Sequence, residues 1–218
     1  MPMIDSNRAN IALQKVNPQP YIDIMTVFSS SGSVANSSKF RQLFAKFYQL
    51  NRAYGAPSFL DPYFEIFDGV KNGMIPQDIK TILEEIQKKC RKKGRTNGTI
   101  ELSFASKMLH TINPDDYPIW DSILVPSNHQ INKKRRHEHF HGAPYGIKNN
   151  GWHGLVDNAV KEYEDYMKVF IQYKNLATGN NNDLGGQDLI ALFDNCPRFK
   201  GLPISNIKKI DFILWKDR

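Results

Sequence analysis

The chain reads TIELSFASKMLHTINPDDYPIWDS from Thr99 to Ser122. Thr99 can cap a helix that we expect over 100–111, and the Asn113-Pro114 pair then ends it. Proline and aromatic residues favour an extended backbone over 117–120, and Asp121 is well placed to cap the next helix. This stretch therefore predicts two helices joined by a short connection.

Helical periodicity recurs on both sides of this stretch. Apolar residues return every three or four positions in longer segments, and two short helices are expected at the end of the chain. These segments are 38–54, 76–90, 155–174, 187–195 and 207–215, the last of them capped by Ser205. Alternation typical of strands is nearly absent, so the sequence predicts a mostly α fold.

The first 37 residues differ in character from the rest. They contain Pro2, Pro18 and Pro20, and a Ser/Gly/Asn-rich run follows one apolar patch at 21–28. We interpret 1–37 as an N-terminal arm with one short element, for which a β-hairpin is a candidate. Residues 38–218 are then expected to form a single compact helical domain with a long, basic, polar loop at 127–152.

The composition favours a globular domain and argues against a membrane protein and a disulfide scaffold. The 218 residues are 40% hydrophobic and 23% charged, which is typical of a globular domain. No apolar stretch approaches the roughly 18 residues of a membrane span. The chain contains two cysteines, which argues against a disulfide scaffold and against a four-cysteine zinc or iron–sulfur site. We therefore expect a soluble cytoplasmic monomer with no membrane partner and no cofactor.

The excess of positive charge is clustered. Lysine and arginine total 29 against 22 acidic residues, for a formal net charge of +7, and this favours a polyanionic partner such as nucleic acid. Six cations lie within 88–95, and four are consecutive at 133–136. The structural alternatives are a solvated loop for the second cluster and, for the first, a helix end whose negative dipole attracts cations.

One lysine and one aspartate stand out as a candidate catalytic pair. Lys107 lies in a largely apolar helix, where desolvation favours the uncharged and nucleophilic form of an amine. Asp121 follows fourteen positions later, and a chain that turns back through 113–116 can bring it beside the lysine. In the structural alternative Asp121 caps a helix, and Lys107 extends its amine out to solvent.

These residues resemble the helix-hairpin-helix DNA glycosylase superfamily, and most closely its divergent 8-oxoguanine-DNA-glycosylase-like branch. Lys107 matches the Schiff-base lysine of that family, and 118–122 matches the stretch that ends in its catalytic aspartate. The resemblance covers roughly 99–125. It departs from the family in two respects: 101–106 lacks the glycines that usually precede the lysine, and the spacing from lysine to aspartate is shorter.

The resemblance implies a glycosylase-like helical fold and an enzyme that flips a modified or damaged base out of double-stranded DNA. It would cleave the N-glycosidic bond and leave an abasic site. Lys107 would attack the sugar C1′ atom, and Asp121 would stabilise the positive charge on the sugar and orient or deprotonate the amine. An imine at Lys107 would allow strand cleavage by β-elimination, whereas Asp121 acting with water would give a monofunctional enzyme.

The resemblance implies two candidate substrates. One is 8-oxoguanine, which would make the protein a DNA repair enzyme. The other is a hypermodified phage base such as glucosylated hydroxymethylcytosine, because a small chain without the usual hairpin is similar to bacterial family members that act in antiviral defence.

Other residues are candidates for contacts with DNA. His110, Trp120 and Ser122 lie next to the pair and are candidates for binding the substrate base, although Trp120 in the core and a structural His110 are the alternatives. In the long loop we expect contacts with DNA from several cationic and aromatic side chains. These are Lys133, Lys134, Arg135, Arg136, His139 and Tyr145.

Two other classes of function stay open. Glu138 and the alternating His137, His139 and His141 could serve a metal-dependent nuclease or toxin, although their spacing matches no specific ligand pattern and we predict no metal. The second class is a helical DNA-binding module without chemistry. Such a module would bind DNA with a steep salt dependence and release no product.

Overall fold

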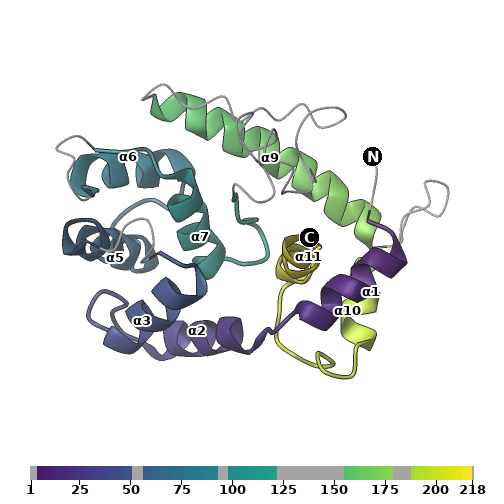
Figure 1. The fold of residues 1–218 in the computed structure, drawn as a ribbon. Helices are drawn as coiled ribbons and strands as arrows, with labels where there is room; N and C mark the ends of the chain where they lie inside the picture. Colours follow the sequence, from purple (N-terminus) through teal and green to yellow (C-terminus); the bar gives the residue numbers. More distant parts are fainter. Residues whose placement is uncertain (1–3, 51–55, 93–97, 122–154, 179–187, 218) are drawn as a thin grey trace. The chain divides into compact units, whose positions relative to one another are not determined.

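The computed structural model describes residues 4–50, 56–92, 98–121, 155–178 and 188–217. Across these ranges the regular structure is helical and contains no strand, so the prediction of a mostly α fold is confirmed (Figure 1). The helices are α1 (Ser6–Lys15), α2 (Gln19–Ser30), α3 (Ser38–Phe47), α5 (Pro57–Lys71), α6 (Ile79–Lys89), α7 (Leu102–Ile112), α9 (Val156–Ala177), α10 (Leu189–Asn195) and α11 (Asn206–Lys216).

The contacts between residues divide the chain into two compact units. The central unit comprises 18–112 and 152–160, and the terminal unit comprises 1–17, 113–151 and 161–218. The proposed boundary at 37 and 38 lies within the central unit, and the division into an arm and a single helical domain stays a prediction.

Aromatic side chains fill the core of the central unit. Phe40 and Phe44 of α3 pack against Phe67 of α5, with each of them 5.6 Å from it between ring centroids. Tyr63 and Phe64 on the same helix complete the cluster, and all five side chains are almost completely buried. Rings at these separations and inclined to one another are favourable beyond the area they bury. The cluster joins α3 to α5.

Helix α5 contains an internal proline that the fold accommodates. Pro62 has no N–H with which to bond the carbonyl of Ser58, four residues earlier. That carbonyl instead accepts the N–H of Arg91 at 3.1 Å, and the Ser58 hydroxyl donates to the Arg91 carbonyl at 3.1 Å. The carbonyl that Pro62 leaves open and the neighbouring hydroxyl therefore join the start of α5 to the residue that follows α6 by two positions. These two helices lie side by side (Figure 1).

In the terminal unit α1 packs against α10 and α11. Every residue from Ile207 to Leu214 is buried. Arg8 on α1 forms an ion pair with Asp217 at 2.5 Å between Nη2 and Oδ2. Ser205 accepts a hydrogen bond from the Lys208 N–H at 3.2 Å, which confirms the predicted cap of α11.

The expectation of one short element, a candidate β-hairpin, within 1–37 is wrong. Two helices, α1 and α2, occupy most of this segment. Asp5 caps α1 by accepting the Arg8 N–H at 2.8 Å, and Pro18 and Pro20 stand at the start of α2. Proline is well tolerated in a first helical turn, where its missing N–H has no partner in the helix, so the prolines begin a helix here.

Candidate functional site

A stripe of polar side chains runs along α7 inside the protein. Its members stand at positions i, i+3, i+4, i+7 and i+8, which lie on one face of an α-helix. They are Ser103, Ser106, Lys107, His110 and Thr111, and all of them except the half-buried Ser103 are buried. The apolar face of the same helix, which includes Phe104 and Met108, is also buried. Helix α7 is therefore enclosed on its polar face as well as on its apolar face.

Lys107 lies at the middle of this stripe with 5% of its surface exposed. Its ammonium group donates a hydrogen bond to the Ser103 hydroxyl and lies 5.6 Å from the centroid of the Tyr48 ring. A hydroxyl can accept a hydrogen bond from the ammonium group, and the face of an aromatic ring attracts its positive charge. Both contacts stabilise the lysine inside the protein. This side chain belongs to the central unit.

The two described residues proposed to bind the base are both buried. His110 is fully enclosed, and its Nε2 atom lies 3.3 Å from the Tyr21 hydroxyl of α2. Trp120, which belongs to the terminal unit, is 4% exposed. The position of each residue agrees with the structural alternative considered for it, and base binding by either one stays a prediction.

The segment that leads to Asp121 is held by tyrosines of α9. Residues 117–121 are neither helix nor strand, and Pro118, Ile119 and Trp120 are buried. The Tyr163 hydroxyl donates to the Pro118 carbonyl at 2.9 Å, and the Tyr166 hydroxyl donates to the Ile119 carbonyl at 2.8 Å. Burial raises the pKa of Tyr166, and the nearby carboxylates of Asp211 and Asp121 raise it further. Asp121 is half-buried and belongs to the terminal unit.

A buried ion pair in α11 was not predicted from the sequence. The Lys208 ammonium lies 2.6 Å from the Asp211 carboxylate and 4.7 Å from the centroid of the Phe212 ring, and the lysine is 3% exposed. The signal in the sequence was the spacing of a lysine and an aspartate by three positions in a helix that is apolar over most of its length. Asp211 therefore adds a second carboxylate near Tyr166.

We predict a large loss of stability when Asp211 is replaced by alanine. The ammonium of Lys208 would stay buried without this carboxylate, and breaking a buried pair in this way typically costs about 3–5 kcal/mol. The control is Asp194→Ala, which removes the more exposed partner of Lys209 and should cost at most about 1 kcal/mol. Denaturant unfolding of both variants measures the difference, and equal losses would contradict the burial of the Lys208 pair.

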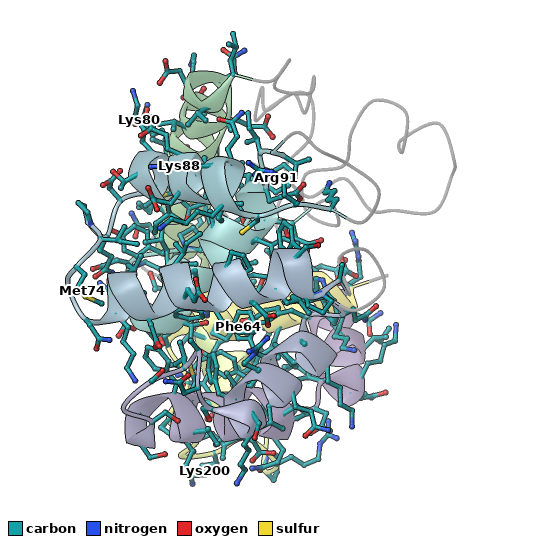
Figure 2. All side chains as sticks on the ribbon, turned by 90° about the vertical axis from the view of Figure 1, so that its left-hand side faces the viewer. Phe64, Met74, Lys80, Lys88, Arg91 and Lys200 are labelled. Atoms are coloured by element: carbon teal, nitrogen blue, oxygen red, sulfur yellow. The ribbon has the colours of Figure 1, made fainter. Side chains whose placement is uncertain are left out.

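The cations in the described part of the first basic cluster are largely engaged within the protein. The Arg91 guanidinium donates to the carbonyls of Gln87 and Lys88 at the end of α6, at 3.0 and 2.7 Å. Lys89 pairs with Glu85 and Lys92 pairs with Glu101, each at 2.5 Å. Lys88 is exposed, and Figure 2 shows it near Arg91. The described cations thus lie at the C-terminal end of α6, where Arg91 caps the last carbonyls. This agrees with the structural alternative, in which the cations lie at the negative end of the helix dipole.

Arg91 and Lys88 should differ in their effect on stability. Arg91→Ala removes charged donors from the last carbonyls of α6, which should lower the free energy of unfolding by about 1–2 kcal/mol. Lys88→Ala changes an exposed side chain and should stay within about 0.5 kcal/mol of the wild-type value. Thermal unfolding followed by circular dichroism measures both. A loss for Lys88→Ala as large as that for Arg91→Ala would argue against the capping role.

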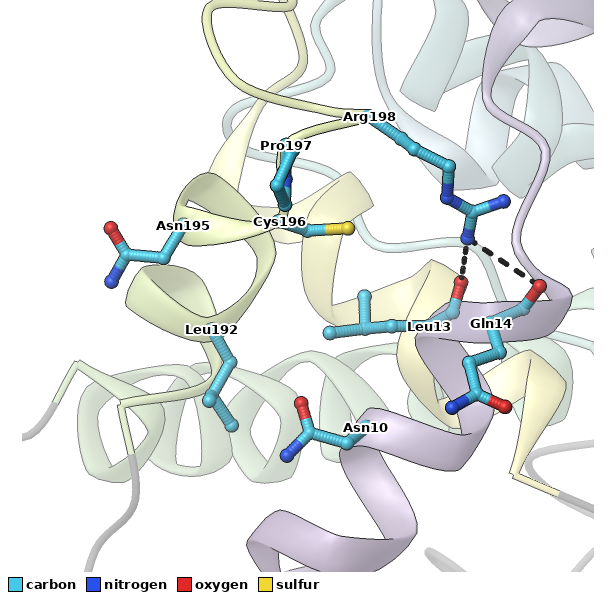
Figure 3. Close-up of a pocket in the computed structure, with 8 residues that line it drawn as sticks. All are labelled: Asn10, Leu13, Gln14, Leu192, Asn195, Cys196, Pro197 and Arg198. Atoms are coloured by element: carbon cyan, nitrogen blue, oxygen red, sulfur yellow. Dashed lines mark hydrogen bonds between the residues drawn. The ribbon is translucent and has the colours of Figure 1, made fainter.

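The terminal unit has a hollow of about 600 Å³ beside the end of α1. Figure 3 shows the Arg198 guanidinium directed at the end of α1, where it donates to the carbonyls of Leu13 and Gln14 at 2.8 and 3.4 Å. The remaining lining residues are Asn10, Leu192, Asn195, Cys196 and Pro197. Arg198 caps the helix, and the predicted site residues that the structure describes (Lys107, His110, Trp120 and Asp121) are not among those that line the hollow. We therefore assign the hollow no role in catalysis.

Cysteine chemistry is not favoured at Cys90. This residue is completely buried, and burial raises the pKa of its thiol to about 12. The thiolate is the nucleophilic form of cysteine, so Cys90 is unsuited to attack a substrate at neutral pH. It packs in the core of the central unit.

Several predicted contacts lie outside the described residues. These are Ser122, Lys133, Lys134, Arg135, Arg136, His139 and Tyr145, together with His137, Glu138 and His141 of the alternative metal site. Within the part of the chain that the structure describes, no group of three or more His, Cys, Asp or Glu residues could hold a metal ion. The same part contains no helix with the length and apolar character needed to cross a membrane.

Comparison of the chain with protein-family models, with curated proteins and with solved structures finds no match.

Proposed function

We propose that this protein is a DNA glycosylase that uses Lys107 as its nucleophile. The observation that carries the proposal is the buried polar stripe of α7, with the Lys107 amine at its middle. Placing a lysine inside a protein is unfavourable unless the interior supplies polar partners. A lysine amine is also a side chain that can form a covalent bond with an electrophilic carbon of a substrate. The match of the same residue to the family's Schiff-base lysine supports the assignment.

The reaction follows from the chemistry of the two proposed groups. The nitrogen of Lys107 attacks C1′ of the flipped nucleotide, and a C–N bond forms as the glycosidic C–N bond breaks. The electron pair of the broken bond leaves with the base, which takes up a proton. The Asp121 carboxylate stabilises the positive charge that develops on the sugar. Loss of a proton from the attached nitrogen and opening of the sugar ring give an imine, from which β-elimination can cut the strand.

The charge of the protein supports DNA as the partner. A formal net charge of +7 attracts a polyanion and speeds its association. The described cations of the first basic cluster, at 88–92, are largely engaged within the protein, so we propose the cations at 133–136 for phosphate contacts. We propose double-stranded DNA with a modified base as substrate, either a hypermodified phage base in antiviral defence or 8-oxoguanine in repair. We further propose that the enzyme is a cytoplasmic monomer.

A base-release assay tests the proposal. The full-length protein is incubated with duplexes that carry 8-oxoguanine, glucosylated hydroxymethylcytosine or no modification, all in the presence of EDTA. The proposal predicts free modified base in the supernatant and abasic sites in the DNA, both insensitive to the chelator. Strand cleavage that EDTA abolishes, without release of a base, would favour a metal-dependent nuclease. Salt-sensitive DNA binding without any product would favour a non-catalytic module.

A further inference from the structure

Three carbonyl groups in the segment before Asp121 need partners, because this segment is buried and forms no regular structure. Residues 118–120 are buried, and buried backbone carbonyls are unfavourable without hydrogen bonds. Two of these carbonyls, those of Pro118 and Ile119, accept the hydroxyls of Tyr163 and Tyr166 at 2.9 and 2.8 Å. Both bonds connect residues more than forty positions apart, so they fix the segment to another element of the fold.

We propose that Tyr163 and Tyr166 are positioning residues for the carboxylate of Asp121. This inference rests on the proposed function. The two tyrosines lie three positions apart on α9, so their hydroxyls lie along one face of the helix and bond consecutive carbonyls. Ile119 is two residues before Asp121, which leaves Trp120 alone between the second bond and the aspartate. The two bonds thereby restrict the position and direction of the backbone at Asp121.

The burial of the two side chains fits this role. Tyr163 and Tyr166 are almost completely buried, and their ring centroids lie 6.3 Å apart. Burial raises the pKa of both hydroxyls, so they remain protonated donors throughout the physiological pH range. A buried donor that keeps its proton can hold its acceptor in one place. Such precision matters for catalysis, because a displacement of about 1 Å at a reacting group can lower a rate by roughly a hundredfold.

The chain offers a matched control on the same helix. The Tyr173 hydroxyl also bonds to backbone, accepting the Ile4 N–H at 3.2 Å, and this tyrosine is equally buried. It holds the start of the chain rather than the segment before Asp121. Phenylalanine at 163, 166 or 173 removes a single buried hydroxyl from α9 in each case. A difference between the first two variants and the third therefore reports on Asp121 and not on the loss of a buried hydrogen bond.

The experiment compares Tyr163→Phe, Tyr166→Phe and Tyr173→Phe by single-turnover base excision, by duplex affinity and by hydrogen exchange of the backbone amides. We expect the rate constant for excision to fall roughly tenfold to a hundredfold for Tyr166→Phe and Tyr163→Phe and to stay within about threefold for Tyr173→Phe. Duplex affinity should stay unchanged in all three. The amides of 119–121 should exchange faster in the first two variants alone. In an Asp121→Asn background, Tyr166→Phe should have little further effect on the rate.

Two results would overturn the inference, and they can be told apart. If the wild type excises bases and Tyr166→Phe slows excision no more than Tyr173→Phe, the positioning role is wrong while the proposed function stands. If the wild type excises no base from any duplex, the proposed function is wrong and the tyrosines position nothing for catalysis. In that second case hydrogen exchange still shows whether the two hydroxyls hold the segment as a purely structural element.

Discussion

Replacement of Lys107 by methionine is expected to abolish excision while leaving the protein folded. Methionine keeps most of the volume of lysine and removes the buried amine, whose transfer from water into the protein costs free energy. The free energy of unfolding should therefore stay within about 1 kcal/mol of the wild-type value or rise. Loss of the nucleophile should lower the rate constant for base excision by at least about a thousandfold. Single-turnover excision and denaturant unfolding on the same preparation measure the two effects.

The matched control for this variant is Thr111→Val, one helical turn along the same stripe. The Thr111 hydroxyl donates to the Lys107 carbonyl at 2.8 Å and is buried, but it has no role in the proposed chemistry. We expect this variant to lose stability without a thousandfold loss of excision. If Lys107→Met excises bases at a rate close to that of the wild type, the lysine is structural and the proposed mechanism is wrong.

Replacement of Asp121 by asparagine is expected to give the second large effect. Asparagine keeps the size and the hydrogen-bonding capacity of aspartate and removes its charge, so it cannot stabilise a positive sugar. Loss of one electrostatic stabiliser typically lowers a rate by roughly a hundredfold to a thousandfold, and we expect a fall of this size in single-turnover excision. DNA affinity should change little.

This substitution separates chemistry from helix capping. Asparagine caps a helix about as well as aspartate does, so a capping role for Asp121 predicts almost no change in stability or activity. Asp116→Asn is the control, because Asp116 is exposed and accepts the Asn113 amide at 2.7 Å without a proposed part in catalysis. Equal activity in Asp121→Asn and Asp116→Asn would leave Asp121 as a cap.

Periodicity was sufficient for helices with one clear apolar face. The spacing of Ile82, Leu83 and Ile86 predicted α6, although its start is set by Asp78, which accepts the Thr81 N–H, rather than by Pro76. Helix α3 begins as predicted but ends at Phe47, before the expected limit at residue 54. At its end Gln49 adopts a φ of 55°, which stops a helix and which no apolar pattern reveals.

Helix α5 was not predicted, and its composition explains why. Pro62 inside the helix argues against one, and buried residues stand on most sides of it rather than on a single face. The Ser58 carbonyl, which Pro62 cannot bond, accepts the N–H of Arg91 instead. That bond connects residues thirty-three positions apart in the sequence, and local patterns carry no information about contacts of this kind.

The candidate site was predictable only in part. The helical position of Lys107 followed from the apolar residues around it, and α7 has nearly the expected limits. The buried polar stripe was missed, because serine, threonine and histidine at these positions are equally typical of an exposed helix face. The tyrosine bonds to 118 and 119 and the ion pair of Lys208 with Asp211 depend on tertiary packing, so a single sequence could not reveal them.

Borohydride trapping followed by peptide mass spectrometry identifies the residue that attacks the sugar. The full-length protein is incubated with a duplex that it processes, the imine is reduced to a stable amine, and the digested adduct is sequenced. We expect one cross-linked peptide, with the sugar attached to Lys107. An adduct at another lysine, or base release with no adduct under conditions that trap a known lyase, would contradict the assignment of Lys107 as the nucleophile.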